Sequence, residues 1–286
     1  MKRYIGAAVI LAFVAWQVGD RMASNQHDGV VWSQEFNDER GAQPDPRQWG
    51  YDLGDGSDRQ LQGWGNEELE YYTDSNAIMD GNGNLVISAI RLPASSELGC
   101  YYGACQYTSS RLTTKSLVNF KYGKIEARMK MPEGTGTWPA FWALGSNIDS
   151  VLWPYSGEID IAEGLGRTPR TLYGTIHGPE YSGVGGLSQT IDAEEPLSSA
   201  FHVYGLQWTP GMLRWTFDGK TYHEESKAKF IGRTWVFDQP FFLMLNLAVG
   251  GGFGGAPGAD MPDVARLTID WIRVSKLAGT GTVLTP

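Results

Sequence analysis

The 286-residue chain has only two cysteines, Cys100 and Cys105, in the sequence Cys-Tyr-Tyr-Gly-Ala-Cys. Two thiols with no histidine nearby cannot supply the four ligands of a structural zinc site. In an oxidising compartment they can close a small disulfide loop, whereas elsewhere they remain two free thiols of a loop. We expect the disulfide.

Basic residues are also scarce. The 23 lysines and arginines are outnumbered by 32 aspartates and glutamates, which gives a net charge of −9, and no basic run occurs anywhere. Proteins that bind phosphate backbones normally carry a basic patch. We therefore expect no nucleic-acid partner.

Helical periodicity is a third absence, since no window of helical length repeats its apolar residues every 3.6 positions. Instead, 37 glycines and 14 prolines separate short strand-like runs. Residues 122–131 alternate, with Ile125, Ala127 and Met129 on one face and charged residues on the other. Similar runs occupy residues 85–89, 171–177, 201–208 and 267–274. Residues 213–223 predict a hairpin around Asp218-Gly219. Residues 241–249 form a longer apolar run, which predicts a strand buried on both sides.

Many short antiparallel strands with frequent turn signals predict an all-β fold, a two-sheet β-sandwich or jelly roll. One sheet of such a fold can curve, and its concave face then forms a cleft. Repeats and linker-like breaks are absent, so we assign residues 27–279 to one domain, residues 280–286 to a C-terminal tail, and expect a monomer.

The N-terminus has the features of an export signal. Lys2 and Arg3 precede an apolar stretch at residues 5–18, which is shorter than the ~20 residues of a membrane span. No clean small-x-small cleavage site follows, so residues 1–26 are a signal peptide or an uncleaved N-terminal anchor. In both cases we expect the domain to be exported, secreted or periplasmic, and to touch a membrane only if the anchor persists.

The most informative segment is Ser156-Gly157-Glu158-Ile159-Asp160-Ile161-Ala162-Glu163-Gly164. Three carboxylates on one short strand repel one another, and strands disfavour Asp and Glu. On a solvated outer face such acids alternate with Lys or Arg, but neither occurs between Trp153 and Gly166. The pattern therefore favours a functional site.

Glycoside hydrolysis needs one carboxylic acid to protonate the leaving oxygen and one carboxylate to capture the oxocarbenium-like centre, ~5–5.5 Å apart in retaining enzymes. Glu158 and Glu163 are five positions apart, so strict alternation places them on opposite faces. A β-bulge at residues 161–162 would return Glu163 to the face of Glu158. Asp160 would then lie between them, raise the pKa of the acid and orient the nucleophile through a shared proton.

The segment Glu-Ile-Asp-Ile-Ala-Glu resembles the signature of glycoside hydrolase family 16 in its bulged, laminarinase-type form. Further motifs resemble bacterial endo-1,3-β-glucanases across residues 30–276: residues 31–36, 63–73, 122–128, 138–142, 173–178 and 245–251. The resemblance implies that Glu158 is the nucleophile, Glu163 the acid/base and Asp160 an assistant, with no cofactor for catalysis. At Ala162 the family often has Met, so the packing beneath the bulge departs from the family pattern.

Several residues are candidates for substrate binding. Trp138 and Trp142 are four apart on a strand-like segment and so point the same way, as sugar platforms or as ordinary core tryptophans. Trp153 is a third platform, and the resemblance implies that all three line the cleft. The resemblance also places His177 beside the acid/base, where the alternative is a structural histidine.

By the same resemblance Asn66 hydrogen-bonds sugar hydroxyls. Arg111 and Asn246 are weaker candidates of the same kind. The alternative for Arg111 is a pair with a surface acid, and the alternative for Asn246 is a set of turn contacts. The family commonly carries a structural calcium ion, and the resemblance implies Glu35, Gly83 and Asp270 as its oxygen ligands on the convex side. The alternative for Asp270 is a solvated surface residue.

We expect a retaining endo-glycosidase that hydrolyses internal β-1,3 bonds of laminarin-like β-glucans. A mixed-linkage β-1,3-1,4-glucanase or a galactan hydrolase of the same family is an alternative, but the aromatic set and the lack of a basic cluster for sulfate favour a glucan. A non-catalytic glucan-binding module is a second alternative, although such modules lose the acids that are present here. An unrelated structural sandwich would leave the acidic strand and the tryptophans unexplained.

Overall fold

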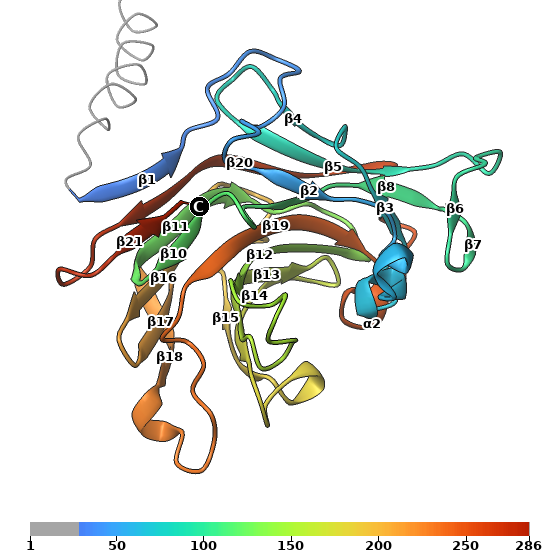
Figure 1. Ribbon diagram of the computed structural model, residues 1–286. Coiled ribbons are helices and arrows are strands. Elements are labelled where there is room, and N and C mark those ends of the chain that lie inside the picture. The colour runs from blue at the N-terminus through green and yellow to red at the C-terminus, as the bar shows by residue number, and fades with distance from the viewer. Residues whose placement is uncertain (1–28, 286) are drawn as a thin grey trace, which may run out of the picture. The chain divides into compact units, whose positions relative to one another are not determined.

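The computed structural model describes residues 29–285, which from residue 31 onward form two stacked β-sheets (Figure 1). Sheet A contains, in spatial order, β18 (Lys220–Ser226), β17 (Met212–Phe217), β16 (His202–Thr209), β11 (Gly123–Lys130), β20 (Val264–Ser275), β5 (Leu85–Arg91), β8 (Tyr107–Ser109) and β3 (Glu70–Tyr72), with β1 (Val30–Gln34) on β20 and β4 (Ala77–Met79) on β5. The predicted all-β sandwich is confirmed.

Sheet B carries the acidic segment. It contains β15 (Leu187–Asp192), β14 (Thr168–His177), β13 (Glu158–Leu165), β12 (Thr137–Gly145), β19 (Phe241–Val249), β10 (Asn119–Lys121) and β21 (Thr282–Leu284), and β9 (Arg111–Thr113) joins β19 to β2 (Gly50–Asp52). The segment assigned to a C-terminal tail, residues 280–286, thus includes a strand that pairs with β10.

The remaining described elements are short. They are the hairpin β6 (Gly99–Cys100) and β7 (Gly103–Ala104), the 3₁₀ turns η1 (Ser57–Arg59), η2 (Gln62–Gly65), η3 (Gly183–Gly185) and η4 (Lys227–Lys229), and α2 (Gly251–Gly254). Among residues 29–285 there is no helix with the length and apolar character to span a bilayer. The predicted signal or anchor, residues 1–26, lies outside the described residues.

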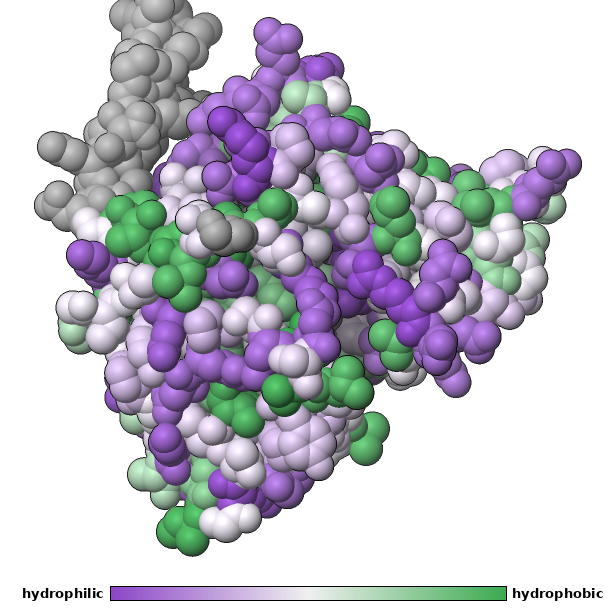
Figure 2. Space-filling view, in the orientation of Figure 1, coloured by the Kyte–Doolittle hydropathy of each residue, from purple (hydrophilic) through white to green (hydrophobic). Residues whose placement is uncertain are grey.

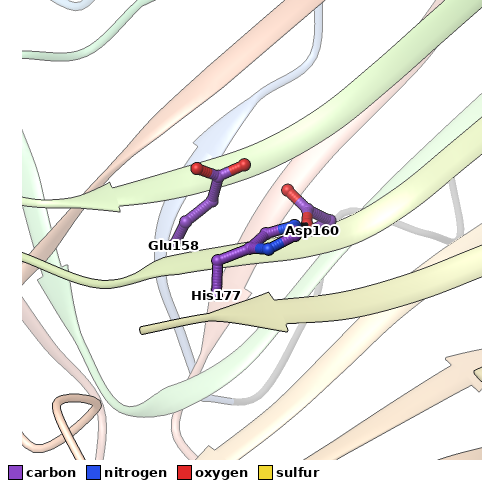
Figure 3. Close-up of side chains that lie close together, drawn as sticks. All are labelled: Glu158, Asp160 and His177. Carbon is purple, nitrogen blue, oxygen red and sulfur yellow. Dashed lines mark ion pairs between the residues drawn. The ribbon is translucent and has the colours of Figure 1, made fainter. Parts of the chain in front are cut away.

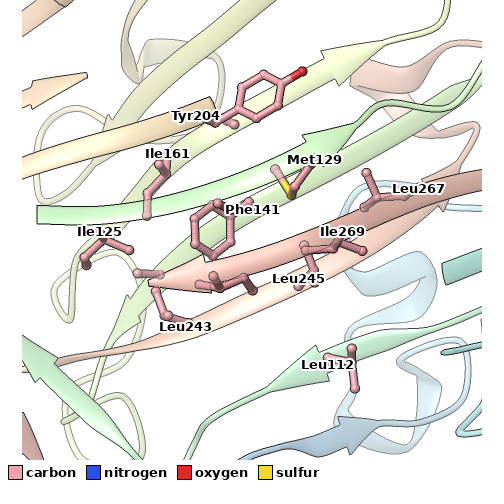
Figure 4. Packing of buried hydrophobic residues seen from close by; sticks show 14 of the residues in the cluster. Leu112, Ile125, Met129, Phe141, Ile161, Tyr204, Leu243, Leu245, Leu267 and Ile269 are labelled. Atoms are coloured by element: carbon pink, nitrogen blue, oxygen red, sulfur yellow. The ribbon is translucent and has the colours of Figure 1, made fainter. Parts of the chain in front are cut away.

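The core lies between the sheets and follows from the alternation seen in the sequence (Figure 4). On β11, Ile125, Ala127 and Met129 are buried as predicted, while the charged residues between them are half-buried on the other face. All nine residues of β19 are buried, as expected for a strand in the middle of sheet B that is covered on both faces. On the surface seen in Figure 2, hydrophilic and apolar side chains are interspersed.

Turn chemistry also agrees with the sequence. Asp218 and Gly219 have φ values of 48° and 78° and connect β17 to β18. Two consecutive positive φ values are what a two-residue type I′ hairpin requires. This hairpin brings Trp215 and His223 opposite each other.

Candidate active site

The three acids lie on β13, and a bulge interrupts this strand between them. Against β12, Asp160 pairs with Trp142 and Ala162 with Phe141, so Ile161 is passed over. Against β14, the three steps from Asp160 to Glu163 match only two steps on the partner strand. The predicted bulge at residues 161–162 is therefore confirmed, and Ala162 beneath it is fully buried.

The two faces of β13 bury different kinds of side chain. Ile159 and Ile161 belong to the hydrophobic core between the sheets. Asp160 and Glu163 are only 3% and 8% exposed, and Glu158 is half-buried. The acids therefore occupy a poorly hydrated environment, where carboxyl groups hold their protons more strongly.

Two of the predicted tryptophans hydrogen-bond directly to the acids. Trp138 on β12 donates from Nε1 to Oε1 of Glu163 at 2.9 Å. Trp153, which is 43% exposed, donates from Nε1 to Oε2 of Glu158 at 2.6 Å. Each indole N–H stabilises a negative charge on its partner. These contacts support the interpretation of Trp138 and Trp153 as residues of the site and not as ordinary core tryptophans.

His177 joins the acids from β14. Its Nε2 lies 3.2 Å from Oδ2 of Asp160, and the potential ligand atoms of His177, Asp160 and Glu158 all lie within 4.8 Å of one another. Figure 3 shows these three side chains converging from two neighbouring strands. His177 therefore borders Asp160 and Glu158 in the same cluster, on the strand next to that of the acids.

Burial and mutual repulsion raise the pKa values of all three acids. Burial and then the charge of Asp160 raise the pKa of Glu158 to about 8. Burial raises the pKa of Glu163 to about 7, against the opposing hydrogen bond from Trp138. Burial and the charge of Glu163 also raise the pKa of Asp160. The cluster therefore retains protons at neutral pH and can hold one acid protonated beside an ionised one, as acid/base chemistry requires.

Trp142 is fixed by a directional chain of hydrogen bonds. Its Nε1 donates to Oδ1 of Asn246 at 2.8 Å, and Nδ2 of Asn246 donates to the hydroxyl of Tyr72 at 3.0 Å. Tyr72 in turn donates to Oε2 of Glu68 at 2.9 Å, and Asn66 donates to Oε1 of Glu68 at 2.9 Å. An indole N–H can only donate, so Asn246 accepts from Trp142 through its amide oxygen and donates to Tyr72 through its amide nitrogen.

Arg111 packs on a face of the same ring. Its guanidinium lies over the rings of Trp142 and Trp64, at 4.9 Å and 4.4 Å from their centroids. Asp52 holds Arg111 at 3.1 Å and also holds Arg59 at 2.7 Å. Arg111 thus pairs with an acid, but Asp52 is buried and is not the surface acid of the alternative. Asn246 lies in the middle of β19 and not in a turn.

The sequence analysis did not identify Glu68, Tyr72, Trp64 or Phe253. The first three lie within residues 63–73, one of the segments that resemble the family, and this resemblance was the available signal. Phe253 on α2 packs edge-on against Trp138 at 5.5 Å between centroids. Its glycine-rich surroundings give no pattern from which this contact could be predicted.

The three calcium candidates belong to sheet A and its turns. Asp270 follows Ile269, which pairs with Leu85 shortly after Gly83, and Glu35 follows β1, which pairs with β20. The topology thus gathers them on one sheet. In this arrangement Glu35 accepts from Arg273 at 2.9 Å and 2.7 Å, and Asp270 pairs with Arg128. An ion would have to displace these guanidinium groups.

Cys100 and Cys105 form the expected disulfide, with 5.0 Å between their Cα atoms. The bridge closes the β6–β7 hairpin. The hairpin is anchored to neighbouring segments, because Tyr101 donates its backbone N–H to Asp55 at 2.6 Å and the Tyr102 hydroxyl donates to the Leu69 carbonyl at 2.5 Å. It therefore packs beside the loop that follows β2.

Known proteins resemble this chain over most of its length. The model of the glycosyl hydrolases family 16 matches residues 64–273. A beta-glucanase of Rhodothermus marinus is 38% identical, over 89% of this chain and 87% of that protein. A glucan endo-1,3-beta-glucosidase of Cryptopygus antarcticus is 38% identical, over 87% and 88%. The laminarinase catalytic domain from Thermotoga maritima MSB8 has a TM-score of 0.81 at 47% identity, over 87% of this chain and 98% of that one.

Proposed function

Because this chain belongs to glycosyl hydrolase family 16, we propose that it is a retaining endo-glycosidase that hydrolyses internal β-1,3-glucosidic bonds of laminarin-like glucans. The observation that carries this proposal is the bulge in β13, because it sets Glu163 on the face of Glu158 with Asp160 between them. Relatives named as a glucan endo-1,3-beta-glucosidase and a laminarinase support the β-1,3 linkage.

In the first step, Glu158 attacks the anomeric carbon and forms a glycosyl-enzyme, while Glu163 gives its proton to the departing glycosidic oxygen. Burial raises the pKa of Glu163, which favours its protonated form before the reaction. A proton shared between Glu158 and Asp160 reduces their mutual repulsion, and the indole of Trp153 stabilises the ionised form of Glu158.

In the second step, Glu163 is ionised and takes a proton from water, which attacks the same carbon and releases Glu158. The indole of Trp138 stabilises Glu163 in this ionised state. Two displacements at one carbon give a product of retained configuration. Family 16 hydrolases need no catalytic cofactor, and every group used here belongs to the chain.

The substrate is held by aromatic faces rather than by charge. Trp138 and Trp142 lie on the same side of β12, and both are half-buried, so their rings remain reachable from solvent. We propose that these rings and Trp153 stack on pyranose faces, with Asn66, Arg111, His177 and Asn246 as their polar neighbours. Such a set suits a neutral glucan better than a sulfated polymer.

The roles of the two glutamates can be separated by rescue. Glu158→Ala should abolish hydrolysis, and azide should restore turnover of an activated aryl β-laminaribioside with inverted product. Glu163→Ala should cleave a substrate with a good leaving group faster than laminarin, because such a group needs no proton, and azide should give retained product. An inverted product from the wild-type enzyme, followed by NMR, would contradict this assignment.

A non-catalytic glucan-binding module is the alternative function. Release of reducing ends from laminarin distinguishes the two, since a binding module releases none. Comparison of laminarin, lichenan, curdlan and agarose as substrates then decides between a β-1,3-glucanase, a mixed-linkage glucanase and a galactan hydrolase.

We further propose a structural calcium ion at Glu35, Gly83 and Asp270, export of the domain, and a monomeric state. The ion would take the place of Arg273 at Glu35 and of Arg128 at Asp270. The ion would stabilise sheet A and take no part in the reaction, because the acids lie on sheet B.

A further inference from the structure

The carbonyl oxygen of Asp160, where the bulge in β13 begins, accepts a hydrogen bond from the other sheet. The donor is Nε1 of Trp215 on β17 of sheet A, at 2.7 Å, and both groups are buried. A bulge interrupts the regular ladder of hydrogen bonds, and a buried carbonyl needs a donor. The indole of Trp215 therefore reaches the point at which β13 departs from regular alternation.

A second side chain holds the indole in this position. His223 on β18 stacks on Trp215, with 4.3 Å between centroids and 17° between planes. Nδ1 of His223 lies 3.0 Å from the carbonyl oxygen of Gly174 on β14, and since a carbonyl only accepts, this nitrogen donates. His223 thus connects Trp215 to the strand that pairs with β13.

Gly174 leaves the space that Trp215 occupies. A Cβ atom at this position would lie 2.6 Å from Cδ1 of Trp215 and 2.5 Å from the hydroxyl oxygen of Tyr222, closer than real Cβ contacts. Gly174 lies between Tyr173 and Thr175, which are the partners of Glu163 and Asp160. The missing side chain is therefore located beside the bulge.

We propose that Trp215, seated by Gly174 and His223, is a positioning residue that holds the bulge in β13 and so keeps Glu163 in place as acid/base. This inference rests on the proposed function. Trp215 touches the Asp160 backbone and acts on the reaction through the strand, since the bulge alone returns Glu163 to the face of Glu158. If the bulge relaxes, Glu163 moves away from the leaving oxygen.

The experiment is the variant Trp215→Phe, which keeps a buried aromatic ring and removes the N–H. General acid catalysis contributes about 10²–10⁴-fold to such reactions. We therefore expect kcat on laminarin and on an aryl β-laminaribioside with a poor leaving group to fall about tenfold or more. The rate of glycosyl-enzyme formation from a 2,4-dinitrophenyl substrate should fall much less, because that leaving group needs no proton.

Trp208→Phe is the matched control. Trp208 is equally buried in sheet A and donates from Nε1 to a backbone carbonyl at 2.9 Å, but this carbonyl belongs to Phe237, which is not on β13. This variant should lower the melting temperature as Trp215→Phe does, while the ratio of the rates on good and poor leaving groups stays at the wild-type value.

An unchanged rate ratio in Trp215→Phe, with the protein folded by circular dichroism, would overturn the proposal. If Trp215→Phe does not fold, His223→Gln decides in its place, because it removes the stacked ring and keeps a side-chain donor for Gly174. An unchanged ratio in that variant would be equally decisive. Failure of the wild-type protein to release reducing ends from laminarin would instead contradict the proposed function, so the two failures are distinguishable.

Discussion

The indole of Trp138 donates its N–H to Glu163, at 2.9 Å, from the strand next to the one that carries the acid. The same ring is half-buried, and we proposed above that it stacks on a pyranose ring. Under the proposed function, one side chain would thus contribute both to substrate binding and to the protonation of the acid/base. Substitution of Trp138 should therefore change the pKa of Glu163, whereas substitution of Trp142, which bonds to Asn246, should not.

Trp138→Phe should move the alkaline limb of the pH profile of kcat/KM to higher pH. The hydrogen bond from Trp138 lowers the pKa of Glu163, so its loss should raise that pKa, and Glu163 then keeps its proton at higher pH. A hydrogen bond to a charged group contributes about 1.5 kcal/mol, so the shift should be about one pH unit. In the control Trp142→Phe, whose indole binds Asn246, the limb should stay in place.

Glu158→Gln should stabilise the protein, and more so at alkaline pH. Because folding raises the pKa of Glu158 to about 8, the native state binds more protons than the unfolded state between pH 4.5 and 8. Wild-type stability therefore falls as the pH rises through this window, whereas the amide does not titrate. The gain in melting temperature should be larger at pH 8 than at pH 5. Glu97→Gln, at an exposed loop position, should change it little at either pH.

Tyr72→Phe should weaken binding of laminari-oligosaccharides, because it disconnects Glu68 from Asn246 and releases the orientation of Trp142. The unsatisfied partners should cost about 1–3 kcal/mol of stability. Titration calorimetry and thermal unfolding measure the two effects. Tyr122→Phe removes a hydroxyl bonded to Asp238, away from the acids, and should leave affinity unchanged. Equal affinities in the two variants would contradict the role of the chain in holding Trp142.

Chelation tests the calcium proposal. Excess chelator should lower the melting temperature, since an ion that binds only the native state stabilises it by mass action, and should barely change the rate below that temperature. Added calcium should restore the melting temperature. An unchanged melting temperature would exclude Glu35, Gly83 and Asp270 as an ion site and leave both carboxylates with their arginines.

The parts of the fold that could be predicted are those determined by local patterns. The alternation in residues 122–131 and the apolar run at 241–249 each identify a strand and its buried faces. The bulge was predictable as well, because Glu158 and Glu163 are five positions apart and can share a face only if one residue is passed over.

The contacts that hold the site together were not predictable, because they join segments far apart in the chain. The chain from Trp142 to Glu68 connects β12, β19 and β3, and Trp215 reaches β13 from the other sheet. Neither spacing nor periodicity encodes which side chains meet across sheets. Arg111 shows the same limit. It lies on β9, whereas the two tryptophan rings that it contacts belong to β12 and to the turn η2.

The strand β19 has a further consequence for how the chain reaches this state. Its sequence, Phe-Phe-Leu-Met-Leu-Asn-Leu-Ala-Val, has no charge and no proline, and in the native protein all of it is covered. Before sheet B closes, the segment is exposed, and such a run can pair with the same run of another molecule. Aggregation therefore competes with refolding, and dilution favours the folded enzyme.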